Sequence, residues 1–487
     1  MRAQRLYGGV LSAMMVAAAV GSVLAGAATV AAAEARPAMA SGTWGTAHPI
    51  PGLAALNVGG DAWINMVSCA SAGNCSVGGS YLNRRHGEFQ AFVASETGGT
   101  WGTAREVPGT ATLNAGFEAS VTSLSCASAG NCSAGGFYTD ASDNEQAFVV
   151  TETNGTWGAA QEVPGVGAKN TGGQARITSV SCAAPGDCSA VGFFRLPSFT
   201  SRAFTVTQTN GAWGTAKAFP GLAARKGSQT VSSVSCASVG NCSAGGSFSD
   251  SSRHAQAYVV SEKNGTWGTA IPTPGVAALN TGGRALITAL SCGAPDNCGA
   301  AGTYQSAGRV HGFVVSENNG IWGTAQQVPG LAALGNDGAG IDSMSCASAG
   351  NCSAGGTYLQ ISSAAIHSQV FVVGEKNGTW GTATPLPGAA TLNKGGGALT
   401  GAVSCATAGN CAIAGSYTDA AGHGQAFVAS QANGTWGTAQ EVPGTAALNS
   451  LGAGEGSSVS CGAVGKCAAG GYYADTTGQQ VFVVNQS

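Results

Sequence analysis

Two cysteines separated by five residues recur eight times and account for all 16 cysteines of this 487-residue chain. The segment reads SCASAGNCSAGG at residues 125–136, where residues 129–131 form the predicted turn of a hairpin. Paired strands would bring two such cysteines opposite each other, within reach of a disulfide. Zinc sites favour closer ligand spacing and a second pair or histidines nearby, so we predict disulfides and no metal or other cofactor. The predicted pairs are Cys69–Cys75, Cys126–Cys132, Cys182–Cys188, Cys236–Cys242, Cys292–Cys298, Cys346–Cys352, Cys405–Cys411 and Cys461–Cys467.

Tryptophan marks the same period independently. Eight tryptophans follow one another at intervals of 54 to 58 residues, and the first cysteines of the pairs recur every 54 to 59 residues. Self-similarity at such a period indicates a repeat architecture. The repeated tryptophans are Trp44, Trp101, Trp157, Trp213, Trp267, Trp322, Trp380 and Trp436, and Trp63 is the one outside the pattern.

The second repeat shows the predicted strands. We expect strands at residues 121–128 and 132–138, a polar loop at 139–145, and further strands at 146–152 and 156–163. Asn154-Gly155 between the last two strands is a two-residue hairpin signal, because such turns need positive φ. Asn-Gly-Thr triplets elsewhere also match a glycosylation sequon, but every repeat needs this turn.

Four antiparallel strands per repeat are typical of a β-propeller blade. The chain has a tryptophan strand at residues 41–47 before its first cysteine hairpin, and it ends at residues 481–484 without one. We therefore predict an all-β, eight-bladed propeller over residues 41–487, closed by the N-terminal strand completing the last blade. Small residues in the cysteine hairpins place those hairpins near the axis, and the repeated tryptophans then belong to the core between blades.

The N-terminus is predicted to be a targeting segment. Arg2 and Arg5 precede an apolar stretch at residues 6–30, and small residues follow. We predict a signal peptide at residues 1–33, with a second cleavage position as late as residue 40. A retained membrane anchor is the alternative, because the stretch is long, and no second hydrophobic span follows it. Paired cysteines agree with export, so we expect a secreted or extracellular protein, with cell-surface association as an option.

Composition restricts the function. Charged residues make up 9% of the chain and the net charge is −3, so a nucleic-acid partner is not expected. No motif of a nucleophile elbow, a zinc protease or a P-loop occurs, and we predict no catalytic residue. Apolar residues reach 44%, which is enough for a buried core.

The repeat as a whole resembles a loosely defined group of secreted tandem-repeat proteins of actinobacterial type. Ser235-Cys236, Cys242, Gly245-Gly246 and Gly265-Thr266-Trp267 carry the resemblance in one unit. It implies a propeller-like fold and export, and it implies no activity. The Asn-Gly-Thr-Trp turn is also similar to the Asp-box hairpin of sialidases but lacks its Ser-x-Asp-x-Gly start.

Two kinds of loop are expected to share one face of the propeller. The loops that join consecutive blades are nearly constant, as in PGLAALN at residues 51–57, and we expect their leucines to pack structurally. The loops between second and third strands vary most, and variable loops on a constant scaffold carry recognition. Surface loops also collect polar residues without any ligand, and this alternative stays open. The predicted ligand-binding residues are Arg84, His86, Arg253, His254, Arg309, His311, His367 and His423, and the same loops contain Arg85, Arg195 and Arg202.

We therefore expect a monomeric binding or scaffold module for a glycan, a cell-wall polymer or a protein. A polysaccharide-active hydrolase or lyase on the same scaffold is one alternative, although two carboxylates at a set separation cannot be placed from the sequence. A structural cell-surface or matrix protein is the other.

Overall fold

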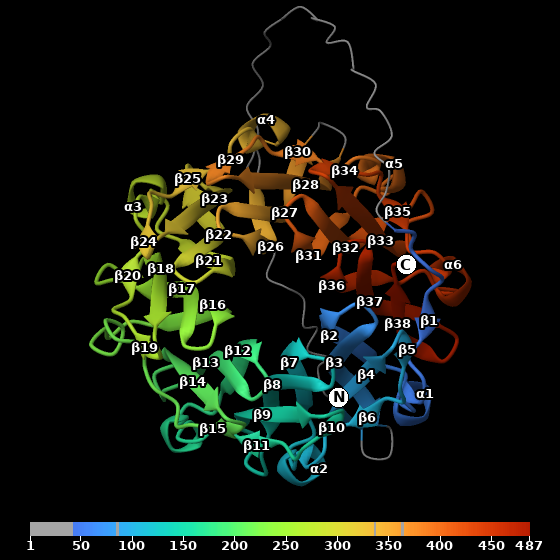
Figure 1. Cartoon of the computed structure of the whole chain (residues 1–487), viewed down its shortest axis with the longest axis horizontal. Helices are drawn as coiled ribbons and strands as arrows, with labels where there is room; N and C mark the ends of the chain where they lie inside the picture. The colour runs from blue at the N-terminus through green and yellow to red at the C-terminus, as the bar shows by residue number, and fades with distance from the viewer. Residues whose placement is uncertain (1–41, 84–86, 336–337, 362–364) are drawn as a thin grey trace, which may run out of the picture. The chain divides into compact units, whose positions relative to one another are not determined.

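Eight antiparallel sheets follow one another around a ring in the computed structural model, which describes residues 42–83, 87–335, 338–361 and 365–487 (Figure 1). The predicted signal peptide, together with Arg84, Arg85 and His86, lies outside the described residues. Each sheet is one blade, and its first strand is nearest the axis. The innermost strands of blades 1 to 8 are β2 (Ala62–Ser71), β7 (Ala119–Ser128), β12 (Ala175–Ala184), β16 (Gln229–Ser238), β21 (Ala285–Ala294), β26 (Ala339–Ser348), β31 (Ala398–Thr407) and β36 (Glu455–Ala463).

The second and third strands run antiparallel beside the first in every blade. The second strands are β3 (Asn74–Asn83), β8 (Asn131–Thr139), β13 (Asp187–Arg195), β17 (Asn241–Ser249), β22 (Asn297–Ser306), β27 (Asn351–Ile361), β32 (Asn410–Thr418) and β37 (Lys466–Asp475). The third strands are β4 (Glu88–Thr97), β9 (Glu145–Thr153), β14 (Ser201–Thr209), β18 (Ala255–Lys263), β23 (Arg309–Asn318), β28 (Ile366–Lys376), β33 (Gly424–Ala432) and β38 (Gly478–Asn485).

The outermost strand differs from the prediction, because it is not continuous. In blade 2, residues 156–163 form two short strands that both pair with β9, and they are separated at residues 158–160. The break arises because the Ala160 N–H leaves the sheet and donates to the Pro108 carbonyl of the preceding blade, at 2.7 Å. The short outer strands are β5 (Thr100–Trp101), β6 (Arg105–Glu106), β10 (Thr156–Trp157), β11 (Gln161–Glu162), β15 (Ala212–Trp213), β19 (Thr266–Trp267), β20 (Ile271–Pro272), β24 (Ile321–Trp322), β25 (Gln326–Gln327), β29 (Thr379–Trp380), β30 (Thr384–Pro385), β34 (Thr435–Trp436) and β35 (Gln440–Glu441).

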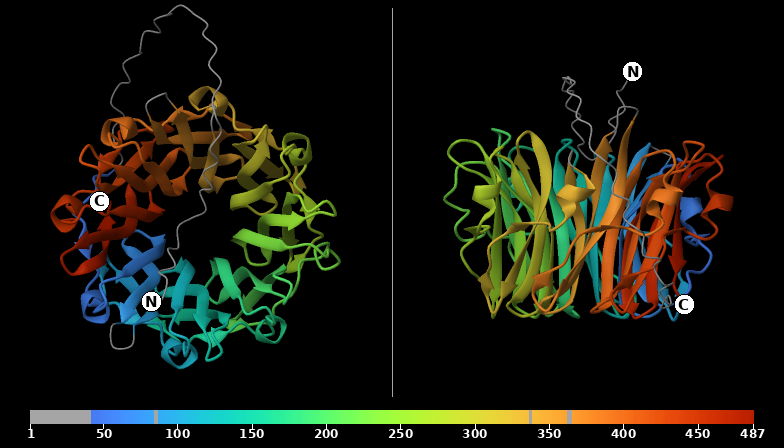
Figure 2. Two further views of the ribbon diagram at one scale, coloured as in Figure 1. Left: turned by 180° about the vertical axis from the view of Figure 1, so that it is seen from behind. Right: turned by 90° about the horizontal axis from the view of Figure 1, so that it is seen from above.

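The N-terminal segment closes the ring as predicted. Strand β1 (His48–Pro49) pairs with β38 of the last blade, and Trp44 forms a bridge with Gln486. Blade 8 is therefore built from both ends of the described chain, which lie together in Figure 1 (blue beside red). Figure 2 shows the strands spanning the ring between its two faces.

All eight predicted disulfides are present, and each joins the first and second strands of one blade. The half-cystines are direct cross-strand partners, as for Cys126 and Cys132. Their Cα atoms are 3.9–4.0 Å apart, closer than the expected 4.5–5.5 Å. A register shift follows the first cysteine, so Ser128 pairs with Asn131 and the turn is one residue shorter than the predicted 129–131 turn.

A closed ring of hydrogen bonds explains why serine precedes every cysteine pair. The backbone N–H of each first cysteine donates to the Oγ of the corresponding serine in the preceding blade, at 2.9–3.0 Å, as from Cys126 to Ser68. The last of the eight bonds, from Cys69 to Ser460, joins blade 1 to blade 8. The Ser-Cys dipeptide thus staples one blade and links it to its neighbour.

A second ring at the outer edge explains the repeated Pro-Gly and Trp-Gly-Thr-Ala segments. The N–H of the alanine three residues after each repeated tryptophan donates to the proline carbonyl of the preceding blade, as from Ala104 to Pro51, at 2.7–2.9 Å. The glycine after that proline has positive φ, and a Cβ on Gly52 would lie 2.4 Å from Thr103 Cγ2. Glycine is required there by both the backbone and the close approach.

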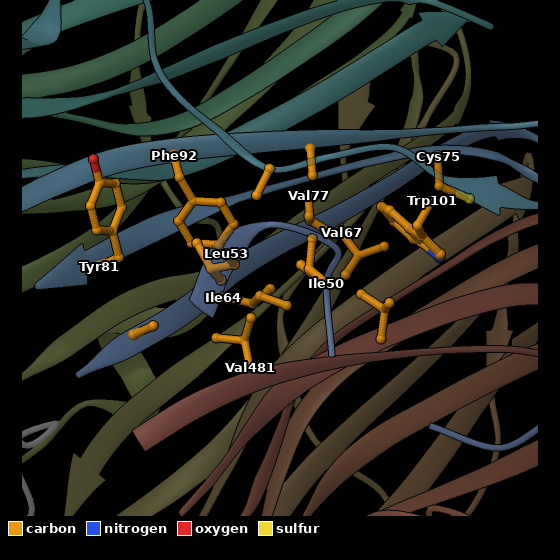
Figure 3. Packing of buried hydrophobic residues seen from close by; sticks show 14 of the residues in the cluster. Ile50, Leu53, Ile64, Val67, Cys75, Val77, Tyr81, Phe92, Trp101 and Val481 are labelled. Carbon is orange, nitrogen blue, oxygen red and sulfur yellow. The ribbon is translucent and has the colours of Figure 1, made fainter. Parts of the chain in front are cut away.

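The cores lie between blades, and one such cluster occupies each junction. Figure 3 shows the junction of blades 8 and 1, where Trp101, Phe92 and Ile64 of blade 1 pack against Val481 of blade 8. Trp101 is 5% exposed, so the predicted role of the repeated tryptophans is confirmed. Trp63 is different, since it is 36% exposed on the innermost strand and meets Tyr472 edge to face at 4.7 Å.

The constant loops contain short helices that the sequence did not predict. Their predicted leucines, such as Leu56 and Leu113, are partly buried against the core clusters, so their structural role is confirmed. None of the described helices is long and apolar enough to cross a membrane. The helices are α1 (Leu53–Leu56), α2 (Thr110–Leu113), η1 (Gly167–Lys169), α3 (Val276–Leu279), α4 (Leu331–Leu334), α5 (Ala389–Leu392) and α6 (Thr445–Leu448).

Candidate ligand-binding pocket on the loop face

Constant and variable loops share one face, here called the loop face, and a repeated asparagine joins them. Asn114 Nδ2 donates to the Phe89 carbonyl and to Gln90 Oε1 in blade 1, and its Oδ1 accepts from the Thr139 N–H in blade 2. This role was not predicted from the sequence, although the asparagine recurs after the loop leucine. The asparagines in this position are Asn57, Asn114, Asn170, Asn280, Asn393 and Asn449, all buried.

The predicted ligand-binding residues lie on the loop face but are spread around it. Those within the described residues occupy four consecutive blades and do not converge on one pocket. They are Arg253 and His254 on blade 4, Arg309 and His311 on blade 5, His367 on blade 6, and His423 on blade 7.

The histidines have structural contacts in this arrangement. A Cβ on Gly283 would lie 2.7 Å from the His254 ring, and Gly396 and Gly452 have similar relations to His367 and His423. Each of these glycines has positive φ and belongs to the loop leading to the next blade. His311 instead stacks on Tyr304, with ring centroids 5.1 Å apart. Ligand binding by these side chains stays a prediction.

Three aspartates of the variable loops are turn formers. Asp419 accepts hydrogen bonds from the backbone N–H groups of His423 and Ala421 and from the Gln425 amide. These bonds, the one from His423 first, outweigh desolvation and lower the pKa of Asp419. Asp140 and Asp250 make the same pattern of contacts, so turn formation explains these carboxylates.

Positive charge is concentrated on and beside blade 3. Seven of the 20 Lys and Arg residues of the chain lie between residues 163 and 249, where Asp187 is the single acidic residue, although the whole chain has a net charge of −3. We call these seven residues the basic patch. They are Lys169, Arg176, Arg195, Arg202, Lys217, Arg225 and Lys226.

A cavity of about 500 Å³ opens within the basic patch, and we call it the basic pocket. Its walls come from the loop entering blade 3, the loop between β13 and β14, and the loop leaving blade 3. Phe194 and Phe204 stack at 6.4 Å between ring centroids and give it an apolar wall. Lys169, Arg202 and Lys217 also line it, and its described lining contains no acidic side chain.

Backbone contacts and aromatic rings hold the arginines of the basic patch in place. Arg202 donates to the carbonyls of Gly227 and Lys226, at 2.7 and 3.1 Å, which fixes it against the loop that leaves blade 3. Arg225 lies over the Phe248 ring, 3.8 Å from its centroid. The buried Nε atoms of Arg195 and Arg225 have no hydrogen-bond partner.

An exposed aromatic ring lies on the same loop. Phe199, in the turn between β13 and β14, is 80% exposed and has a φ of 56°. Its N–H donates to the Leu196 carbonyl, which in turn belongs to a residue that lines the basic pocket. The loop therefore presents a large apolar side chain in a defined turn next to fixed cations.

Fold and site together define a disulfide-stapled, eight-bladed propeller with an electropositive pocket on its loop face. No protein-family model matches the chain, and no curated protein matches it. Within the described residues, no group of three His, Cys, Asp or Glu residues is arranged to hold a metal ion.

Solved propellers resemble the chain only distantly. Sqt1 from Chaetomium thermophilum, bound to the N-terminus of ribosomal protein L10, has 10% identity and a TM-score of 0.48, with 88% of this chain and 98% of that chain covered. The β-propeller domain of the Trilobed protease from Pyrococcus furiosus has 7% identity and a TM-score of 0.44, covering 78% and 95%. The Hadza microbial sialidase Hz136 has 10% identity and a TM-score of 0.37, covering 64% and 66%. These likenesses concern the fold alone.

Proposed function

We propose that this chain is a non-catalytic extracellular binding module that holds an anionic glycan at the basic pocket of blade 3. A uronic-acid polysaccharide or a phosphate-bearing cell-wall polymer has the required chemistry. The observation that carries the proposal is the basic patch, in which Lys169, Arg202 and Lys217 line a cavity without acidic side chains in a protein with net negative charge.

The lining of the basic pocket favours a glycan with acidic groups. Guanidinium groups match carboxylate and phosphate oxygens in geometry and charge. The partly exposed Phe194 side chain, backed by the buried Phe204, offers an apolar wall to the carbon face of a sugar ring. The volume of about 500 Å³ is within the range of small-molecule sites, so the basic pocket would take a short stretch of a chain.

The scaffold supports a role outside the cell. Eight disulfides are typical of proteins that fold in an oxidising compartment. On the loop face, buried asparagines such as Asn114 hydrogen-bond the loops of neighbouring blades together, and such preorganisation lowers the entropic cost of binding.

The experiment is retention of the purified chain on immobilised polygalacturonate, heparin and purified cell walls, with neutral dextran as the control. We expect retention on at least one anionic polymer at 50 mM salt, weakening as salt rises because exposed charges are screened. No retention on any anionic material contradicts the proposal. Release of reducing ends would support the hydrolase alternative, and retention on an acidic protein alone would support a protein ligand.

A further inference from the structure

One polar residue per blade, missed in the sequence, lies buried at each junction between blades. In three junctions a serine hydroxyl accepts from a tryptophan and donates to a glutamate at this position, and in two more the hydroxyl of Ser430 or Thr151 accepts from both the tryptophan and a glutamine. Ser95 of blade 1 accepts from Trp157 Nε1 at 3.2 Å and donates to Glu152 at 2.7 Å, both in blade 2. Ser261 and Ser316 make the same pair of bonds in two other junctions. The residues at the buried position are Glu96, Glu152, Gln208, Glu262, Glu317, Glu375, Gln431 and Gln486.

The junction between blades 3 and 4 contains the same groups but not these bonds. Glu262 Oε2 and Trp267 Nε1 are buried atoms without a hydrogen-bond partner, as are Glu96 Oε2 and Trp101 Nε1 at the junction of blades 8 and 1. Thr207, which occupies the serine position of blade 3, is exposed. Glu262 is 3% exposed, and burial raises its pKa.

Two substitutions within the repeat distinguish this junction. Phe219 stands before the proline where four other repeats have valine, and it packs edge to face against Trp267, with centroids 5.0 Å apart. Thr205 replaces the valine that the other seven repeats have at this position of the third strand. Thr205 is 3% exposed, and its hydroxyl has no partner. Phe219 therefore places a larger ring beside Trp267 at this junction, and Thr205 adds a polar group on the side of blade 3 that faces blade 4.

A cavity of about 360 Å³ occupies this junction, and we call it the junction cleft. Thr205, Thr207 and Ser189 line it from blade 3, and Glu262 and Trp267 line it from blade 4. Its volume is within the range of small-molecule sites. The unpartnered atoms of Thr205, Glu262 and Trp267 thus belong to residues of one cavity, which borders the basic pocket through the shared Lys217.

We propose that the junction cleft binds a hydroxyl-rich small ligand, a single sugar unit or a polyol. Three other junctions show what completes the pair of Trp267 and Glu262, namely one hydroxyl that accepts from the indole N–H and donates to the carboxylate. The Thr205 hydroxyl contacts a second hydroxyl of the ligand. An ammonium ligand can donate to Glu262 but cannot accept from Trp267, so a hydroxyl ligand fits both groups.

The test records the indole N–H signals of the full chain by NMR while glucose, galactose, mannose, N-acetylglucosamine or glycerol is added. We expect the Trp267 signal, assigned from Trp267→Phe, to shift saturably with at least one probe. The signals of Trp157 and Trp322 should stay in place, because serine already occupies those sites. A tetrasaccharide of the bound sugar is then added in the same way. A shift of the Trp267 signal indicates that the junction cleft accepts the terminal unit of a polymer, and no shift indicates a free sugar as the ligand.

Glu262→Gln keeps the size of the side chain, and three repeats have glutamine at this position, so the fold should persist. We expect at least tenfold weaker binding in Glu262→Gln and no change in the matched Glu317→Gln. Phe219→Val should also remove the Trp267 shift by allowing the junction to close. Absence of a Trp267 shift with every probe overturns the inference, as does unchanged affinity in folded Glu262→Gln. Neither result bears on binding at the basic pocket.

Discussion

At the scale of residues, single side chains at fixed repeat positions connect the blades. Asn65 on the innermost strand of blade 1 donates to the Val121 carbonyl of blade 2 at 2.7 Å. Thr122, Thr178 and Thr288 make the equivalent bond to the next blade. Asp342 stands at this position in blade 6, where an ionised carboxylate has no proton to donate.

Asp342→Asn should therefore stabilise the protein at neutral pH. Asp342 is exposed, yet desolvation by the surrounding strands raises its pKa to about 6, despite a hydrogen bond from Thr357. Because the pKa of Asp342 is higher in the folded state than in the unfolded state, its protonated carboxyl stabilises the fold below about pH 4. This stabilisation is lost as the pH rises through about 6. We expect a gain of at most about 1 kcal/mol at pH 7.5, because the side chain also contacts solvent, and none at pH 4.

Urea unfolding at the two pH values measures this difference. The reverse change, Asn65→Asp, should destabilise the protein at pH 7.5 and much less at pH 4. An equal effect of Asp342→Asn at both pH values would show that ionisation of Asp342 is not the cause.

At the scale of elements, the sequence was most informative where side chains repeat strictly. Cysteine spacing and the Asn-Gly turns predicted the hairpins, and all eight disulfides were confirmed. The outer strand was predicted as continuous because the bond from Ala160 to Pro108 joins separate repeats, which local propensity cannot show. The short helices were missed for a similar reason, since four residues such as 53–56 give no helical period.

The double variant Cys126→Ala/Cys132→Ala should cost about 2 kcal/mol in the free energy of unfolding, because the disulfide closes a short loop. Chemical denaturation of the variant and the parent measures this cost. The blade should still form, because its strands keep their ladder and the serine contacts to both neighbours. Complete loss of folding would contradict this view of the disulfide as a local staple.

At the scale of the molecule, the ring depends on a segment distant in sequence from its partner. Trp44 is 6% exposed and donates to Ser430 Oγ at 3.1 Å, within the core cluster of blades 7 and 8. The sequence predicted this closure by counting tryptophan strands against cysteine hairpins. It could not show which junction differs, since that depends on how Phe219 and Trp267 pack.

Trp44→Ala should lower the free energy of unfolding by about 3 kcal/mol, the usual cost of removing a buried tryptophan. Trp63→Ala is the matched control, because Trp63 is 36% exposed and lies outside the repeat pattern. Thermal and urea unfolding of both variants measure the difference. Equal losses would contradict closure of the ring by the N-terminal segment.

The candidate site could be predicted in part. Arg195 and Arg202 were recognised as arginines of the variable loops, and the sequence also contains the charge asymmetry around blade 3. The predicted histidines were instead chosen by residue type, and the structure spreads them over separate blades. Only the folded loops show that Lys169, Arg202 and the phenyl rings line one pocket.

The most direct test of the proposed function compares two triple variants with the same change in net charge. Lys169→Ala/Lys217→Ala/Lys226→Ala removes three exposed charges from the basic patch, and Lys376→Ala/Lys394→Ala/Lys466→Ala removes three exposed charges from blades 6 to 8. Calorimetric titration with the retained anionic glycan should show about tenfold weaker binding for the first variant, since exposed charge pairs contribute about 0.5 kcal/mol each. The second variant should bind as the parent does. Equal affinities of the two variants would contradict binding at the basic pocket.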